Sequence, residues 1–166
     1  MTTNDFIRKC KNSGTLDYFQ MEQIRYGFKM GLSMEQIELY VNPEFNCCQM
    51  SEIRQGFEDG LSMKQVKVYL DPKFNDNQMF QIRYGFHNGL TINQVKVYAR
   101  SEFDADQMFE IRNGFEDGLT IKQVKFYAKP KFNGWQMCQI REFIKENNIT
   151  DMSIKTIEFL IGLNCI

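Results

Sequence analysis

The residues best suited to chemistry in this sequence are five arginines that recur every 29 residues. A guanidinium group can bind a carboxylate or a phosphate through parallel hydrogen bonds, so evenly spaced arginines could read a long anionic ligand. This arginine column consists of Arg25, Arg54, Arg83, Arg112 and Arg141. It is identical in every copy, whereas a recognition surface needs differences between copies. We therefore favour a structural role, in which each arginine covers apolar surface and bonds carbonyls of an adjoining turn, and keep ligand reading as the alternative.

Two of the copies also carry acidic pairs. Glu58–Asp59 and Glu116–Asp117 fall in the last turn of an expected helix, where the helix dipole disfavours negative charge. The same copies carry Lys64 and Lys122 a few residues later, which predicts that the charges pair across the turn that follows. Exposed ion pairs of this kind contribute about 0 to 1 kcal/mol each.

Catalytic residues are harder to find. His87 is the only histidine, and one histidine cannot supply a metal cluster. No serine or cysteine has a histidine base near it in sequence, and the chain has neither a nucleophile elbow nor a glycine-rich phosphate loop. We therefore expect a protein that is not an enzyme and binds no metal or cofactor.

The elements that position these residues come from a repeated unit, marked by the phrase Gln-Met-x-x-Ile-Arg. Four full copies are followed by a partial copy, and no insertion interrupts them. The repeats span 17–45, 46–74, 75–103 and 104–132, between an N-terminal cap at 1–16 and a partial repeat with a C-terminal cap at 133–166. An exact period of this kind is typical of stacked repeats, so we expect one helical-repeat domain.

Each copy reads as two helices. Asn75 with Gln78 has the pattern of a capping box for a first helix, and Ser62 with Gln65 has it for a second. A glycine follows each first helix and is expected to end it in the left-handed conformation. Proline follows each second helix except in the third copy, where Ser101 replaces it and predicts a less sharp end.

The apolar pattern indicates how the helices pack. Met79, Ile82 and Phe86 share one face of a first helix, and Val66 and Tyr69 share one face of a second. Two short helices cannot bury both faces alone, so each copy must pack on its neighbours. A glycine in the middle of each first helix predicts close approach of a neighbouring helix. We expect an all-α fold with ten or eleven helices, an α-solenoid of about five two-helix repeats with capping helices.

Aromatic residues on the opposite face of the first helices are the candidate partner-binding residues. They stand at helical spacing, and exposed aromatics in series suggest an interface. The set comprises Tyr26, Phe80, Tyr84, His87, Phe109 and Trp135. A second apolar column on the second helices is open to two interpretations, burial between copies or a contact surface. It comprises Leu39, Val68, Val97 and Phe126.

The charge balance, the apolar runs and the cysteines weigh against several classes of protein. Lys plus Arg total 20 against 21 Asp plus Glu, so the net charge of -1 lacks the basic footprint of a nucleic-acid-binding protein. The N-terminus lacks a signal-peptide pattern, and no apolar run approaches the roughly 20 residues of a membrane span. The five cysteines include the vicinal pair Cys47–Cys48, which is unsuited to an ordinary structural disulfide. We expect a cytoplasmic protein with reduced thiols and no membrane contact.

The C-terminal segment is apolar on all sides. Ile154, Ile157 and Ile161 can pack on the last repeat, but Phe159 and Leu163 point to the opposite side of the expected helix. A homodimer formed through this helix would cover them, as would a C-terminal tail that folds back.

The motif Gln-Met-x-x-Ile-Arg-x-Gly-Phe-x-x-Gly-Leu, followed by Tyr-x-x-Pro-x-Phe, resembles short helical repeats in uncharacterised proteins from phages and mobile elements of Gram-positive bacteria. The resemblance covers Asp17 to Arg141. It implies a helical-repeat fold and a phage-encoded inhibitor of a bacterial defence nuclease, in the manner of an anti-CRISPR protein. The leading hypothesis is a protein-binding module that occupies a partner surface. A nucleic-acid reader using the arginine column and a homo-oligomeric structural module are the alternatives.

Overall fold

The computed structural model describes residues 1–150, and this part of the chain contains ten helices and no strand. The expected all-α class is confirmed. The chain divides into two compact units, residues 1–83 and the residues from Tyr84 onward. Helix α1 (Thr3–Ser13) opens the first unit. The long helices are α2 (Tyr18–Lys29), α4 (Cys47–Glu58), α6 (Asp76–His87), α8 (Ala105–Glu116) and α10 (Gly134–Glu146). The short helices are α3 (Met34–Tyr40), α5 (Met63–Val66), α7 (Ile92–Tyr98) and α9 (Ile121–Tyr127).

The predicted capping boxes start both kinds of helix. At α6, Asn75 Oδ1 accepts from the Gln78 backbone N–H at 2.9 Å, and Gln78 Oε1 accepts from the Asn75 N–H at 2.8 Å. Ser62 and Gln65 make the same reciprocal bonds at α5. These side chains satisfy amide groups that the first turn of a helix leaves without partners.

The glutamine of the long-helix capping box has a second role. Its amide nitrogen reaches the carbonyl oxygen of the phenylalanine that closes the following short-helix segment. Gln49 donates to Phe74 at 2.6 Å in the first unit, and Gln107 donates to Phe132 at the same distance in the second. Both glutamines are buried, so one side chain caps a helix and also ties it to the chain 25 residues later.

The long helices end as the glycines predict. Gly60 has φ 82°, the left-handed region, and the backbone N–H of Leu61 bonds to the Gly56 carbonyl at 2.9 Å. This six-to-one bond, together with the bond from Gly60 to Phe57, forms a Schellman motif. Positive φ recurs at the equivalent residues Gly31, Gly89 and Gly118.

The short helices end differently from the prediction. In the third copy α7 ends at Tyr98, the position equivalent to Tyr40 and Tyr127, although Ser101 stands where other copies have proline. The expected less sharp end is therefore wrong. An inverse γ-turn ends α7, because Ala99 has φ -70° and ψ 67° and the Arg100 N–H bonds to the Tyr98 carbonyl at 2.7 Å. The turn does not require proline.

Each mid-helix glycine contacts a tyrosine that ends the following short helix or, in the case of Tyr69, lies just beyond it. A β-carbon at Gly56 would lie 2.0 Å from the Tyr69 hydroxyl oxygen, and one at Gly114 would lie 1.9 Å from that of Tyr127. The Tyr127 hydroxyl donates to the Glu110 carbonyl at 3.3 Å, so its proton has a partner inside the core. The predicted close approach to bare backbone is confirmed, and the group that approaches is a buried tyrosine ring.

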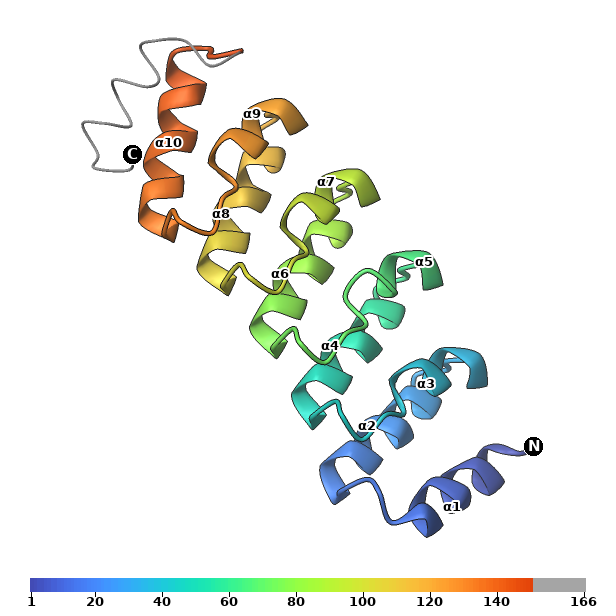
Figure 1. Cartoon of the computed structure of the whole chain (residues 1–166). Helices are drawn as coiled ribbons and strands as arrows, with labels where there is room; N and C mark the ends of the chain where they lie inside the picture. The colour runs from blue at the N-terminus through green and yellow to red at the C-terminus, as the bar shows by residue number, and fades with distance from the viewer. Residues whose placement is uncertain (151–166) are drawn as a thin grey trace. The chain divides into compact units, whose positions relative to one another are not determined.

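Each unit builds its core by packing one copy on the next. Figure 1 shows α4 beside α2 in the first unit and α10 beside α8 in the second, and both pairs are in contact. Short helices also reach the following copy, since α3 packs on α4 and α7 packs on α8. No helix within residues 1–150 has the length and apolar character to cross a bilayer.

Candidate binding surface on the long helices

In the first unit, the arginine column bonds to carboxylates. The Arg83 Nε donates to Glu52 Oε2 at 2.9 Å, and its Nη1 donates to Asp59 Oδ2 at 2.5 Å, both in the preceding copy. Arg54 forms an ion pair with Glu58, one turn along its own helix. The Arg83 side chain is only 11% exposed. Arg83 therefore joins two copies within the unit.

The second unit repeats this arrangement. The Arg141 Nε donates to Glu110 Oε2 at 3.2 Å, and its Nη1 pairs with Asp117, again in the preceding copy. Arg112 Nη1 lies 2.5 Å from Glu116 Oε1 on its own helix. The contacts at Arg141 correspond to those at Arg83, and the contact at Arg112 corresponds to that at Arg54.

Electrostatics favour these pairs. Burial alone would lower the pKa of Arg83, but its bonds to Glu52 and Asp59 outweigh burial and hold the pKa above its ordinary value. The pKa of Arg141 is raised by the same balance. Burial would raise the pKa of Asp117, but Lys145, 3.0 Å away, and Arg141 lower it. The guanidinium groups are thus held as cations by acids of this chain.

These contacts correct two predictions. The arginine heads bond carboxylates, where carbonyl groups of an adjoining turn were expected. Within residues 1–150 neither Lys64 nor Lys122 forms an ion pair, so the predicted pairing across the turn is wrong. A buried guanidinium group has several fixed donors and needs an anionic partner more than an exposed lysine does. The acidic pairs therefore bond to the arginine column.

A pattern of alternate copies is visible only once these contacts are known. Copies 46–74 and 104–132 supply the carboxylates that receive Arg83 and Arg141. The equivalent positions in the other two full copies hold Gln23, Met30, Gln81 and Asn88. The ion pairs therefore have a period of two copies, although the helices have a period of one. Comparing each position across alternate copies could have revealed this signal.

Exposed aromatic rings lie against the buried guanidinium groups. In the first unit, the Arg54 Cζ lies 5.8 Å from the Tyr26 ring centroid, and that of Arg83 lies 5.4 Å from the Phe80 centroid. In the second unit, the Arg112 Cζ lies 4.7 Å from the Tyr84 centroid and 5.2 Å from that of Phe109. The four rings are 38% to 48% exposed. They are in the range where cation–π contact orients a ring.

The other two predicted partner-binding residues, His87 and Trp135, are also exposed. His87 ends α6, with its ring centroid 6.1 Å from that of Tyr84. Trp135 is 62% exposed in the first turn of α10. Sequence reasoning passed over Tyr18 and Phe19, two exposed rings in edge contact at the start of α2. The predicted oligomer contacts, Phe159 and Leu163, lie outside the described residues.

The second apolar column on the short helices is mostly covered. Val97 is buried, whereas Leu39, Val68 and Phe126 are partly exposed. This supports burial between copies at Val97, whereas the other three residues remain partly exposed and could form a contact surface.

Among residues 1–150 no group of three histidine, cysteine or acidic side chains could hold a metal ion, and the four cysteines in this part are free thiols. No family model, curated protein or solved structure matches the chain.

Proposed function

We propose that this chain is an α-solenoid of about five two-helix repeats that acts without catalysis, by binding a partner protein and occupying its surface. Support for the repeat architecture comes from hydrogen bonds that recur at equivalent positions within each unit, such as Gln49 to Phe74 and Gln107 to Phe132. The free thiols favour a reducing compartment, and we place the protein in the cytoplasm.

The observation that carries this proposal is the set of exposed rings held on buried arginines. Tyr84 and Phe109 both stack on Arg112, whose side chain is 5% exposed and ion-paired with Glu116. Rings fixed in this way lose little freedom on binding, and aromatic residues are enriched at protein interfaces. An exposed surface of oriented rings is well suited to a protein partner.

The same contacts weigh against the nucleic-acid alternative. Reading phosphates would require the arginine column to exchange its carboxylate partners for a ligand. Breaking a buried ion pair costs about 3 to 5 kcal/mol because it leaves an uncompensated charge. The more specific role, inhibition of a bacterial defence nuclease, stays a prediction from the resemblance.

The test compares capture of partner proteins by the parent chain and by a Tyr84→Ala, Phe109→Ala variant. Both would be immobilised and exposed to nuclease-treated lysate of host cells, with the retained proteins quantified by mass spectrometry. We expect a protein retained by the parent to fall at least about tenfold with the variant, because hot-spot aromatics contribute about 2 kcal/mol or more each. Met30→Ala, which truncates another exposed apolar residue, is the matched control.

Thermal unfolding of the same proteins separates contact from packing. The double variant should keep the helical content of the parent, with a modest loss of stability from the two cation–π contacts. Equal capture by parent and variant would contradict the proposed surface. A protein captured from untreated lysate but not from nuclease-treated lysate would favour the nucleic-acid alternative.

A further inference from the structure

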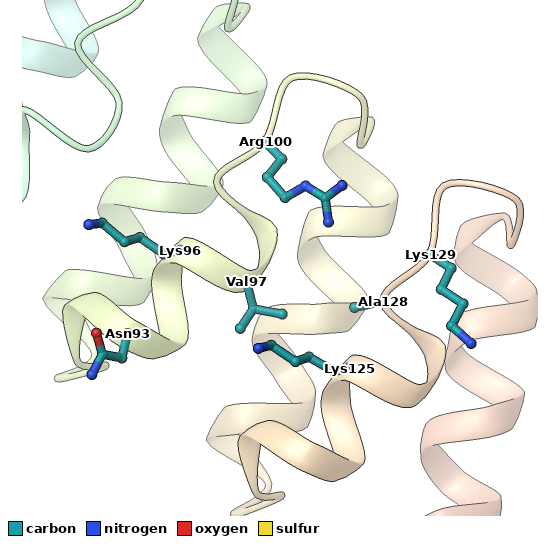
Figure 2. Close-up of a pocket in the computed structure, with 7 residues that line it drawn as sticks. All are labelled: Asn93, Lys96, Val97, Arg100, Lys125, Ala128 and Lys129. Atoms are coloured by element: carbon teal, nitrogen blue, oxygen red, sulfur yellow. The ribbon is translucent and has the colours of Figure 1, made fainter.

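A basic groove lies between α7 and α9 in the second unit, on different helices from the rings of α6 and α8. Figure 2 shows side chains from both short helices, and from the turns that follow them, around this groove. It has a volume of about 490 Å³. Four cations line it: Lys96, Arg100, Lys125 and Lys129.

The charge of the groove is one-sided. No carboxylate is among its lining residues, so four like charges share one concave surface. Within residues 1–150, neither Lys96 nor Lys125 has an ion pair. Clustered charges of one sign in a cleft raise the local potential and attract an oppositely charged ligand. The chain as a whole has a net charge of -1, so this concentration of positive charge is local.

The arginine of the groove is paired with a carboxylate of this chain. Arg100 forms an ion pair with Glu102, and its Cζ also lies 5.2 Å from the Phe103 ring centroid. Both partners of the ion pair are about half exposed, at 48% and 45%, so an incoming carboxylate could exchange with Glu102. Such an exposed pair contributes about 0 to 1 kcal/mol and offers little resistance.

The rest of the lining is Asn93 and two apolar residues, and it lacks aromatic rings. Val97 and Ala128 are 8% and 7% exposed and lie among the cations. Sites for single-stranded nucleic acid combine basic residues with rings on which bases stack, and no ring lines this groove. A ligand that combines carboxylates with a small apolar side chain fits this lining better than a sugar-phosphate chain does.

We propose that the groove between α7 and α9 binds an acidic peptide segment of a partner protein. Carboxylates of the segment lie against Lys96, Lys125 and Lys129, and an apolar side chain lies over Val97 and Ala128. The volume suits a few side chains rather than a folded surface. This contact is separate from the aromatic rings, and it goes beyond the proposed function by naming the chemistry of the ligand.

The test is fluorescence anisotropy with a short fluorescein-labelled peptide composed of glutamate and leucine, titrated with the full chain at low salt. Lys96→Glu with Lys125→Glu should weaken binding about tenfold or more, since each substitution replaces attraction by repulsion. Lys96→Gln with Lys125→Gln should give a smaller loss, which guards against misfolding of the reversed variant. Lys9→Glu with Lys64→Glu, the same charge change at two exposed lysines outside the groove, should change affinity less than about threefold.

Three results would overturn the proposal. Binding by the Lys96→Glu, Lys125→Glu variant within about twofold of the parent would place the peptide elsewhere. Tighter binding of an oligothymidylate than of the peptide would assign the groove to nucleic acid. Salt-sensitive self-association in sedimentation, lost in the same variant, would assign it to a second copy of this chain. The Tyr84→Ala, Phe109→Ala variant should bind the peptide as the parent does, so this test can fail or succeed independently of the proposed function.

Discussion

At the scale of single residues, the mid-helix glycines lie directly against tyrosine side chains. A mid-helix glycine normally weakens a helix by about 1 kcal/mol relative to alanine. Here the missing side chain makes room for a ring, since a β-carbon at Gly85 would lie 2.0 Å from the Tyr98 hydroxyl oxygen. Tyr69 and Tyr98 are fully buried, so the rings have no space to move away.

Gly56→Ala should therefore destabilise the protein by about 1 to 3 kcal/mol, the cost of overpacking, despite the better helix propensity of alanine. Adding Tyr69→Phe should recover part of the loss, because the next ring atom lies 3.3 Å from the built β-carbon. Urea unfolding of both single variants and the double variant gives the coupling free energy. Strictly additive effects would show that the two residues do not constrain each other.

The same tyrosines predict a dependence on alkaline pH. Burial raises above the ordinary value the pKa of the four tyrosines that lie against the mid-helix glycines. They are Tyr40, Tyr69, Tyr98 and Tyr127. Stability is fully present below the unfolded tyrosine pKa of about 10. It falls as the pH rises further toward the raised folded pKa, because only the unfolded chain releases its protons there.

Each tyrosine should lower the free energy of unfolding by about 1.4 kcal/mol per pH unit in that range. Urea unfolding at pH 8 and pH 11 would measure this loss in the parent and in Tyr69→Phe. The variant should lose about 1.4 kcal/mol less than the parent over this interval. Identical losses in both would mean that Tyr69 ionises equally well in the folded state.

At the scale of helices, the sequence was most informative about where helices begin and where the long helices end. Reciprocal capping at Asn75 with Gln78, and left-handed glycine at Gly60, are local effects that a few residues encode. The end of α7 at Tyr98 was not predictable from proline, since the ring packs on a distant glycine and an inverse γ-turn follows. Such an end depends on packing between helices, which local patterns do not record.

At the candidate surface, the exposure of the aromatic residues was predictable from the sequence, but the partners of the arginine column were not. Exposure of Tyr84 and Phe109 follows from helical periodicity and agrees with the structure. The partners of the arginine column did not follow, because Arg83 meets Glu52 across a distance of 31 residues in the chain. Periodicity places a residue on a face of a helix, but it does not give the register between two helices.

The arginine column offers an internal comparison at this scale. Arg83→Ala should cost about 2 to 3 kcal/mol, less than for a fully buried pair, because the Glu52 and Asp59 side chains left without their partner are 16% and 28% exposed. Arg25→Ala should cost less than about 1 kcal/mol, because Arg25 is 42% exposed and, within residues 1–150, pairs only with Glu22 on its own helix. Chemical denaturation of the two variants tests the difference. Equal costs would refute the claim that Arg83 joins two neighbouring copies.

At the scale of the whole molecule, helices at equivalent positions in the repeat carry two kinds of ion-pairing surface. Copies 17–45 and 75–103 lack the acids that copies 46–74 and 104–132 present to the arginine that follows. A copy can therefore match the shape of its neighbour and still mismatch its charges.

The ion pairs between copies are consequently kept when an even number of copies is removed and lost when an odd number is removed. Removing residues 46–74 would place Arg83 after a copy that offers Gln23 and Met30 in place of two carboxylates, with a loss of about 2 to 3 kcal/mol beyond the lost packing. Gln23→Glu with Met30→Asp in that shortened chain should recover most of the lost stability, measured by calorimetry on the two shortened chains of equal length. No recovery would disprove the dependence on an even number of copies.

Removing two copies, residues 46–103, would instead leave Arg112 with Glu116 on its own helix and with Tyr26 where Tyr84 had been. Duplications and deletions in the gene thus preserve the ion pairs between copies when they add or remove two repeats at a time. This limits how such a chain can lengthen or shorten.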